Sequence, residues 1–414
     1  MEIKEKLNHL PAWAVPAAIF FLALAVRLAY IYFSGFSVIP DPDTSEYLAY
    51  AENMLKGLGY TDGQWRAFRA PGYPFFAAAV YYIFGPSIPV LKAAQALLSS
   101  AVPVLIYYIG LRTGGRLAGL VAGFFACFYF GLVLEPYHLV SEAVFTPLFA
   151  LSVLLLLKTE DHWAYAPAAG AALGLTTLSR PVGLVILAAA GLWLFIKYPP
   201  RRALGYTLAA ALALCVVMAP WWVRNYRVFH AFVPVCLETG FVLKHTRVPE
   251  AILQFNDHLP ELQRDRQNAR EAIAYLKTRE MSELLRGSVI RFLTFLHPFM
   301  PSYDFTYALI LPFWLYGIYL VLKTRNTNAM LLFSMFIYFP VAFVFCGTAR
   351  HRHSVGPYFI LLAALAAAAL FEKYRNSAAR RPLLYALAAW CAINVGILLY
   401  PDPVRLFLKR MAGV

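Results

Sequence analysis

The chain has 414 residues, of which 61% are hydrophobic and 14% are charged. A soluble protein carries about a quarter of charged residues, so this composition excludes an ordinary soluble domain. The formal net charge is +14. It does not point to nucleic acid, because most of the excess lies in short segments between apolar blocks, as in membrane proteins.

Eleven apolar segments are each close to the roughly 20 residues that cross the hydrocarbon of a bilayer. They are 11–33, 88–111, 117–137, 141–157, 163–179, 181–196, 203–223, 306–322, 329–346, 355–371 and 382–400. The first follows a charged N-terminus without a small-residue cleavage site, so we expect it to be retained. The five cysteines form no CxxC pair, which gives no support to a disulfide framework or a zinc site. We therefore predict an all-α polytopic membrane protein with about eleven transmembrane helices.

The segment 71–85, PGYPFFAAAVYYIFG, is apolar but short. If it spanned the membrane, Arg112 and Arg116 would move to the outer side. If it lies in the interface, most cations of the short loops fall on one side, which the positive-inside rule assigns to the cytoplasm. We therefore predict an interfacial or re-entrant helix here, and a cytoplasmic N-terminus.

Two long polar segments, 34–70 and 224–304, then face the outside. Within the second, 260–292 is rich in charge and has periodic apolar positions, which predicts one or two amphipathic helices at the membrane surface. The expected organisation is a transmembrane catalytic module over 1–223 with an outer loop at 34–87, an extracytoplasmic loop over 224–304, and C-terminal transmembrane helices over 305–414.

The first outer segment places three carboxylates within six residues, at Asp41, Asp43 and Glu46. Asp43 is expected to cap a helix that starts at Thr44, with Glu46 completing a capping box. Helix capping alone would account for these residues. The alternative is that a carboxylate here abstracts a proton from an acceptor.

Arg69 stands in the string RAPGYP, at the entrance of the expected interfacial helix. An arginine there serves either as a lipid anchor or as a fork for a phosphate. Further along, Glu135, His138 and Glu142 lie near the outer boundary of the bilayer, where carboxylates are costly and often functional. Snorkelling or a buried pair is the alternative, and His138 with Glu142 is only a weak metal signal.

Other cations are predicted at the same outer face. They are Arg180, Arg224 and the run His351-Arg352-His353. Each alone is most simply a charge at a helix end. Together they predict a positive, aromatic-lined face suited to a lipid phosphate, with carboxylates beside it.

The order and spacing of these motifs resemble the GT-C superfamily of polyprenyl-phosphate-sugar-dependent glycosyltransferases. The resemblance is nearest to the branch of the protein O-mannosyltransferases and the lipid A aminoarabinose transferase. The motifs that carry it are Asp43-Tyr47-Ala51 at spacing four, Gly57–Tyr60, Arg69–Pro74, Ser141-Glu142, Arg180-Pro181, Pro220–Asn225 and the HRHSVGP string around Arg352. The resemblance implies outward-facing catalytic loops and an aspartate of the first loop as general base, which is Asp43 here. The family often has Glu after this Asp, where this chain has Thr44, so Asp41 remains an alternative base.

The predicted reaction is an inverting transfer of a monosaccharide from a polyprenyl-phosphate carrier at the outer face of a bacterial inner membrane. The predicted catalytic residues are Asp43, Asp41 and Glu142. The predicted donor-phosphate ligands are Arg69, Arg224, Arg352 and Arg180. The predicted substrate-binding residues are Tyr47, Tyr73, His138, His351 and His353. The scheme requires no cofactor, although Asp41, Asp43 and Glu142 offer ligands for a divalent metal.

Two other classes remain open. A lipid-linked-sugar flippase or transporter would place ionisable groups near the membrane midplane and often shows internal repeats. The only clear intramembrane charge here is Arg27, with Lys92 near a helix end, and no repeat is visible. An O-antigen polymerase or ligase would also have a large outer loop, but it would lack the acidic segment after the first helix. The sequence leaves the sugar and the acceptor open.

Overall fold

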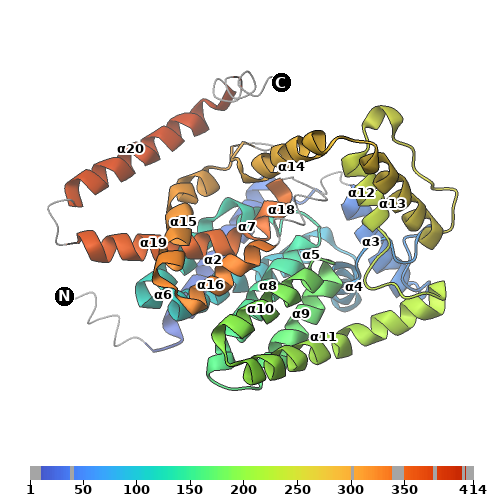
Figure 1. The fold of residues 1–414 in the computed structure, drawn as a ribbon, viewed down its shortest axis with the longest axis horizontal. Helices are drawn as coiled ribbons and strands as arrows, with labels where there is room; N and C mark the ends of the chain where they lie inside the picture. The colour runs from blue at the N-terminus through green and yellow to red at the C-terminus, as the bar shows by residue number, and fades with distance from the viewer. Residues whose placement is uncertain are drawn as a thin grey trace.

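The computed structural model describes residues 11–37, 42–299, 303–337, 349–375, 380–402 and 406, and these residues contain helices and no strand. Every predicted apolar segment lies wholly or partly on a helix. The elongated bundle has α3, α4, α12 and α13 at its right-hand end in Figure 1. The predicted all-α membrane fold is confirmed.

The helices of the bundle mostly follow one another with short connections, apart from the two long segments between α2 and α5 and between α11 and α15. They are α2 Ala14–Ser34, α5 Ile88–Ser99, α6 Ala101–Phe128, α7 Phe130–Leu134, α8 Glu142–Leu157, α9 Tyr165–Ser179, α10 Gly183–Lys197, α11 Pro200–Phe229, α15 Phe305–Thr324, α16 Thr327–Ser334, α18 Ala349–His353, α19 Gly356–Tyr374 and α20 Arg380–Leu399. Among the described residues, seven helical runs are long and apolar enough to cross a membrane. The predicted count of eleven spanning helices is not confirmed. Helices α9 and α10 have 15 residues each, which gives about 22 Å, shorter than the roughly 30 Å hydrocarbon core.

One of the seven runs, Ile88–Phe128, is folded back on itself. The chain breaks its helical path at Gly115, whose φ of 80° lies in the region that favours glycine. A Cβ on Gly110 would lie 2.7 Å from the Cα of Gly119, so the two halves of α6 pack against each other closely. The turn brings Arg112 and Arg116 to one end of the hairpin, as the predicted topology requires.

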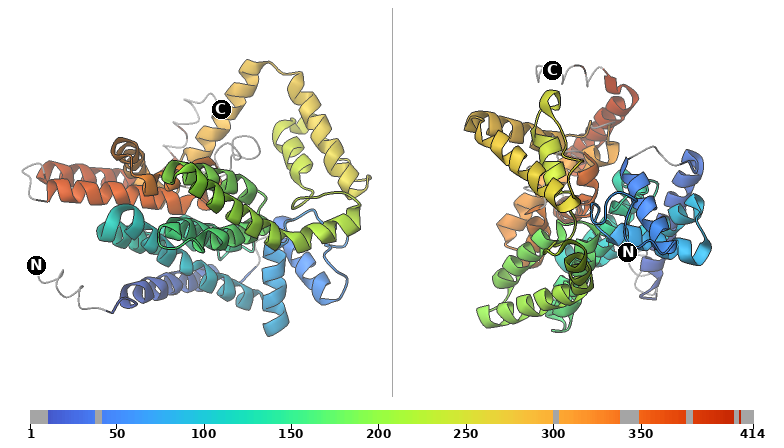
Figure 2. Two further views of the ribbon diagram at one scale, coloured as in Figure 1. Left: turned by 60° about the horizontal axis from the view of Figure 1, so that its bottom comes forward. Right: turned by 90° about the vertical axis from the view of Figure 1, so that its right-hand side faces the viewer.

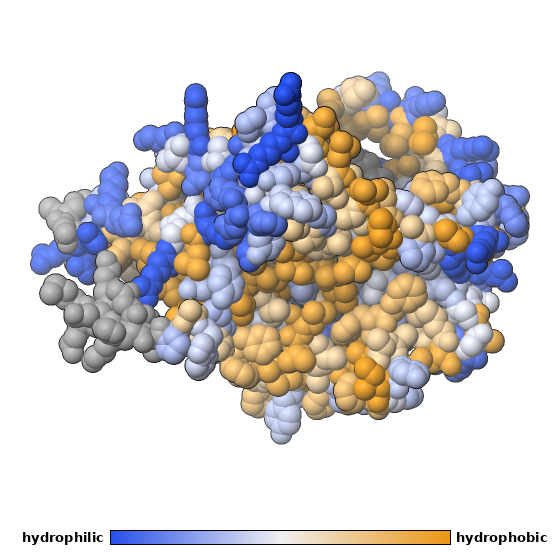
Figure 3. Space-filling view, turned by 90° about the horizontal axis from the view of Figure 1, so that it is seen from below, coloured by the Kyte–Doolittle hydropathy of each residue, from blue (hydrophilic) through white to orange (hydrophobic). Residues whose placement is uncertain are grey.

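The lateral surface of the bundle is apolar where lipid would contact it. Figure 3 looks onto the side where α11 lies in Figure 1, and a broad hydrophobic belt covers its middle with hydrophilic residues toward the ends. On α11, Leu208, Leu212 and Val216 are 59–68% exposed. On its inner side α11 packs tightly on α9, because a Cβ on Gly170 would lie 2.0 Å from the carbonyl oxygen of Ala210.

The predicted short helix over 71–85 is present as α4, Gly72–Phe84. It lies across the direction of α19 and α20 in the left panel of Figure 2. That is the orientation of a helix in the membrane plane. Its first residue, Gly72, allows α4 to approach the end of α9 closely, because a Cβ there would lie 2.5 Å from the Oγ of Ser179.

The two long polar segments that the sequence predicts to face the outside, called the first and second outer segments below, fold into α3 Pro42–Leu55, α12 Thr239–Arg247, α13 Glu261–Lys277 and α14 Met281–Leu296. The prediction of one or two helices over 260–292 is confirmed with two. The prediction that Asp43 caps a helix starting at Thr44 is wrong, because α3 begins at Pro42 and Asp43 lies in its first turn. Proline is favoured at that position, since the first helical N–H has no partner within the helix. Asp41 lies outside the described residues.

Candidate active site at one end of the bundle

The centre of the site is the guanidinium of Arg69, which binds three carboxylates through three different nitrogens. Nη2 donates to Asp43 Oδ1 at 2.6 Å, Nε to Glu46 Oε2 at 2.5 Å, and Nη1 to Glu238 Oε2 at 3.1 Å. Asp43 and Glu46 are three residues apart on α3 and therefore share a helix face. Glu238 comes from the second outer segment, just before α12. We call these four residues the Arg69 cluster.

The cluster is half-buried. The Arg69 side chain is 13% exposed, and the three carboxylates are 20–28% exposed. Burial opposes the charge of Arg69, but the surrounding carboxylates raise the pKa of its guanidinium above the usual value. Burial raises the pKa of Glu46, and the nearby guanidinium offsets this only in part. A guanidinium has five N–H donors, so two remain beyond the three bonds to carboxylates.

The backbone before Arg69 is fixed by the second outer segment. The carboxylate of Glu261, at the start of α13, accepts from the backbone N–H groups of Arg66 and Ala67 at 2.7 and 2.8 Å. The N–H of Leu237 donates to the carbonyl of Ala67 at 2.7 Å. Two segments separated by more than 160 residues in sequence are thus held together beside the cluster.

Two aromatic residues lie under the cluster. Tyr47 and Tyr73 make an edge-to-face contact with centroids 5.1 Å apart, and the guanidinium of Arg69 lies 5.7 Å from the Tyr47 ring. Both rings are buried. Both rings belong to a hydrophobic cluster with Leu139, Val140 and Val144, the residues on either side of Glu142. The tyrosine pair therefore connects the Arg69 cluster to the start of α8.

At the start of α8, Glu142 forms an ion pair of 2.6 Å with Arg180, which ends α9. The Glu142 side chain is 2% exposed and that of Arg180 is 16% exposed. Glu135 lies nearby and accepts from Thr146 Oγ1 at 2.8 Å. The sequence left open whether Glu142 snorkels toward the interface or forms a buried pair, and the structure shows the buried pair.

The structure places Arg352 in the interior. It is fully buried, and its guanidinium binds Asp304 at 3.1 Å and the carbonyls of Phe295 and His297 at 3.1 and 2.7 Å. It thereby fastens the end of α14 to α18, and its role as a phosphate ligand stays a prediction.

The three predicted histidines lie around α7 and α18. The ring of His353 packs on α7, where a Cβ on Gly131 would lie 2.9 Å from it. Burial lowers the pKa of His353 to about 4, which Asp304 only partly opposes. All three histidine side chains are partly exposed, and the carbonyl of His138 accepts from Gln95.

Arg224 lies on the other flank of the Arg69 cluster. Its Nη2 donates to the carbonyl of Tyr60 at 2.9 Å, while the hydroxyl of Tyr60 donates to the carbonyl of Arg69 at 2.9 Å. The guanidinium also lies 4.9 Å from the ring of Trp221. Tyr60 therefore separates Arg224 from the cluster while contacting both.

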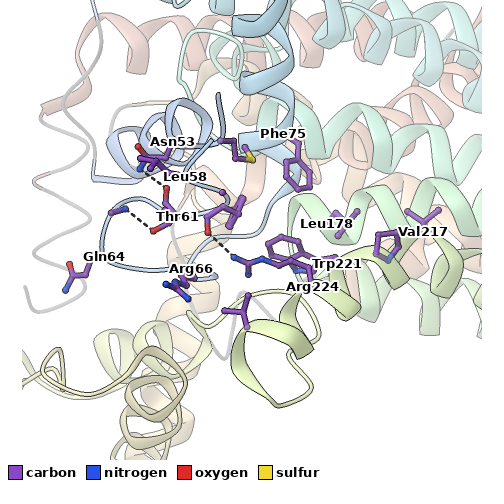
Figure 4. A pocket seen from close by; sticks show the side chains of 16 residues that line it. Asn53, Leu58, Thr61, Gln64, Arg66, Phe75, Leu178, Val217, Trp221 and Arg224 are labelled. Atoms are coloured by element: carbon purple, nitrogen blue, oxygen red, sulfur yellow. Dashed lines mark hydrogen bonds between the residues drawn. The ribbon is translucent and has the colours of Figure 1, made fainter. Parts of the chain in front are cut away.

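Beside Arg224 is a cavity of about 1120 Å³, between the connection from α3 to α4 and the last part of α11. Figure 4 shows Arg66 and Arg224 on one part of its wall, and Phe75, Leu178 and Val217 on another. The cavity combines two cations with an apolar wall.

The described residues contain no group of three or more His, Cys, Asp or Glu side chains arranged to hold a metal. The three carboxylates of the Arg69 cluster are each paired with the guanidinium. The sequence interpretation missed Glu238 and Arg66, because no motif marks either residue and only the fold brings them to the site.

Comparison with known proteins bears on the family and the fold. Residues 68–223 match the sequence model of the dolichyl-phosphate-mannose-protein mannosyltransferase family. An uncharacterized protein from Aquifex aeolicus is 24% identical over 208 residues, which are 48% of this chain and 42% of that one.

Two solved structures of an oligosaccharyltransferase from Archaeoglobus fulgidus share the fold. The complex with Zn and sulfate has a TM-score of 0.61 and 14% identity, over 92% of this chain and 52% of that one. The AglB complex with an inhibitory peptide and a dolichol-phosphate has a TM-score of 0.59 and 12% identity, over 94% of this chain and 55% of that one. The chain thus spans about half the length of these proteins. The predicted resemblance to the GT-C superfamily is confirmed for the fold, and for residues 68–223 by the family match.

Proposed function

We propose that this protein is an inverting glycosyltransferase that takes a monosaccharide from a polyprenyl-phosphate carrier at the outer face of a bacterial cytoplasmic membrane. The observation that carries the proposal is the Arg69 cluster, where a carboxylate of the first outer segment meets a guanidinium at one end of an apolar bundle. Support also comes from the match to a mannosyltransferase family and from the fold shared with an enzyme that was solved with a dolichol-phosphate.

In the proposed reaction, Asp43 accepts the proton of an acceptor hydroxyl, whose oxygen attacks the anomeric carbon of the sugar. The bond from that carbon to the phosphate oxygen breaks, and the configuration inverts. The carrier leaves as a phosphate monoester dianion, which needs no proton. Asp43 is suited to this role because it lies in the first turn of α3, 25% exposed, with Oδ1 already oriented by Arg69.

The phosphate of the donor is assigned to Arg69, whose guanidinium lies 5.7 Å from the Tyr47 ring, and to Arg180, whose guanidinium lies 5.8 Å from the Phe145 ring. Arg69 keeps two N–H donors beyond its carboxylate partners. Arg180 is held at the end of α9 by Glu142. Preorganised donors of this kind stabilise charge that grows on the leaving group, and the loss of one costs roughly 10² to 10³ in rate. Arg352 is assigned a supporting role, because it binds Asp304 and the carbonyls of Phe295 and His297 at the end of α14.

The test is sugar transfer in detergent from a panel of polyprenyl-phosphate monosaccharides, comparing wild type with Asp43→Asn. We expect the variant to transfer at least about 100-fold more slowly, because it cannot accept the proton. Asp161→Asn is the matched control, since Asp161 pairs with Arg112 outside the Arg69 cluster. Equal transfer by wild type and Asp43→Asn would remove Asp43 as the base. Lipid movement across vesicles without any transfer would favour a flippase instead.

A further inference from the structure

The cavity beside α11 has the two kinds of wall that an amphipathic ligand needs. Phe75, Leu178 and Val217 form an apolar side, while Arg66 and Arg224 project from the polar side (Figure 4). Neither arginine makes an ion pair within 4 Å with a described carboxylate. Two cations on one cavity wall repel each other unless an anion lies between them. The lining is therefore complementary to a negatively charged group attached to a hydrocarbon chain.

The cavity also lies where a hydrocarbon chain can reach it from the membrane. Val217 lines the cavity, and its neighbour Val216 is 64% exposed on the apolar belt that covers this side of the molecule (Figure 3). Phe75 and Leu58, both in the lining, are 43% and 65% exposed. Large apolar side chains with this exposure favour an opening toward lipid over one toward water.

The position of the cavity relative to the Arg69 cluster indicates which substrate occupies it. In an inverting displacement the attacking oxygen approaches the anomeric carbon from the side opposite to the departing phosphate, so the acceptor and the donor phosphate occupy different sites. The donor phosphate is assigned to Arg69 and Arg180. Neither Arg69 nor Arg180 lines the cavity. Tyr60 separates the cavity from the Arg69 cluster, because its hydroxyl donates to the carbonyl of Arg69 and its carbonyl accepts from Arg224.

We propose that this cavity binds the acceptor, and that the acceptor is an anionic lipid. Its headgroup lies between Arg66 and Arg224, and its chain lies along Phe75, Leu178 and Val217. This inference rests on the proposed function. A hydroxyl of the bound headgroup gives its proton to Asp43 as its oxygen replaces the phosphate oxygen on the sugar.

The experiment measures binding of phosphatidylglycerol to the purified full chain in detergent, by native mass spectrometry and without any sugar donor. Phosphatidylcholine with the same chains is the zwitterionic comparison. Wild type is expected to bind phosphatidylglycerol at least about tenfold more tightly than phosphatidylcholine, because charge-assisted hydrogen bonds to two arginines favour the anion.

Two pairs of variants separate the parts of the site. Val217→Phe fills the apolar side and is expected to weaken phosphatidylglycerol binding about tenfold, whereas Val216→Phe on the neighbouring lipid-facing position leaves it unchanged. Arg66→Gln is expected to remove most of the preference for the anionic lipid. Arg270→Gln, which removes an exposed arginine of α13 outside the cavity lining, is expected to keep that preference.

Equal binding in Val217→Phe and Val216→Phe would overturn the inference and leave the proposed function standing. Undecaprenyl phosphate is measured in the same variants, and a selective loss of its binding in Val217→Phe would assign the cavity to the donor and also overturn the inference. The proposed function fails separately, if Asp43→Asn transfers sugar as fast as wild type.

Discussion

The contact between the two outer segments depends on Glu261, and replacing it should loosen the backbone that carries Arg69. Its carboxylate is 9% exposed and accepts two backbone hydrogen bonds, from Arg66 and Ala67. Glu261→Ala leaves both N–H groups without this acceptor. A hydrogen bond to a charged group contributes about 1.5–3 kcal/mol. Burial raises the pKa of Glu261, which shows that its charge is itself costly here, so the lower end of that range applies.

Two bonds at that lower end give about 3 kcal/mol of local stability. Since 1.4 kcal/mol corresponds to a factor of ten in an equilibrium, amide exchange over residues 66–69 should become roughly 100-fold faster in Glu261→Ala. Glu261→Gln keeps one acceptor oxygen, so its exchange should rise only about tenfold.

The assay is hydrogen–deuterium exchange of the purified chain, read on peptides that contain residues 66–69. Glu283→Ala is the control, because its carboxylate is 59% exposed on α14 and makes only a long contact of 3.9 Å with Arg279. Sugar transfer should fall together with protection in Glu261→Ala, since Arg69 loses its fixed place. Unchanged exchange in Glu261→Ala would refute the view that this carboxylate holds the two segments together.

Two further outcomes follow from burial and packing. The lowered pKa of His353, about 4, means that between pH 4 and 6.5 the unfolded chain binds a proton that the folded chain does not. The free energy of unfolding should therefore fall as the pH drops through that window, by up to about 1.4 kcal/mol per pH unit. The slope of melting temperature against pH should flatten in His353→Gln but not in the control His162→Gln. Equal slopes in the two variants would contradict this. Gly170→Ala should destabilise the chain by about 1–3 kcal/mol, because the new methyl group would meet the carbonyl of Ala210. Gly205→Ala, with open space around it on α11, should be neutral or stabilising in the same thermal unfolding assay.

The bundle could be predicted because hydrophobicity in a membrane protein is local information. Within the described residues, each apolar segment of the sequence lies wholly or partly on a helix, and the cations at Arg112 and Arg116 mark the turn that Gly115 makes in the structure. The number of spans did not follow in the same way. Helices α9 and α10 are apolar but only 15 residues long, so packing against neighbours and not hydropathy decides how deep they lie.

The site was predictable only in part. Asp43, Tyr47, Arg69 and Tyr73 lie within about 30 residues of one another in sequence, and the structure brings them together. Glu238 joins them from 169 residues beyond Arg69, and nothing in the residues around it marks it. The carboxylate that completes the site therefore depends on long-range folding of the second outer segment.

The docking of the second outer segment also couples the proposed acceptor cavity to the proposed base, Asp43. Residues 66–69 carry Arg66, which lines the cavity, and Arg69, which binds Asp43. Glu261 holds the backbone between them. Any movement of this short segment shifts the proposed acceptor headgroup and the proposed base together. Because the second outer segment supplies both Glu261 and Glu238, its docking sets the distance between the acceptor and Asp43, and a displacement of about 1 Å there is enough to cost roughly 100-fold in rate.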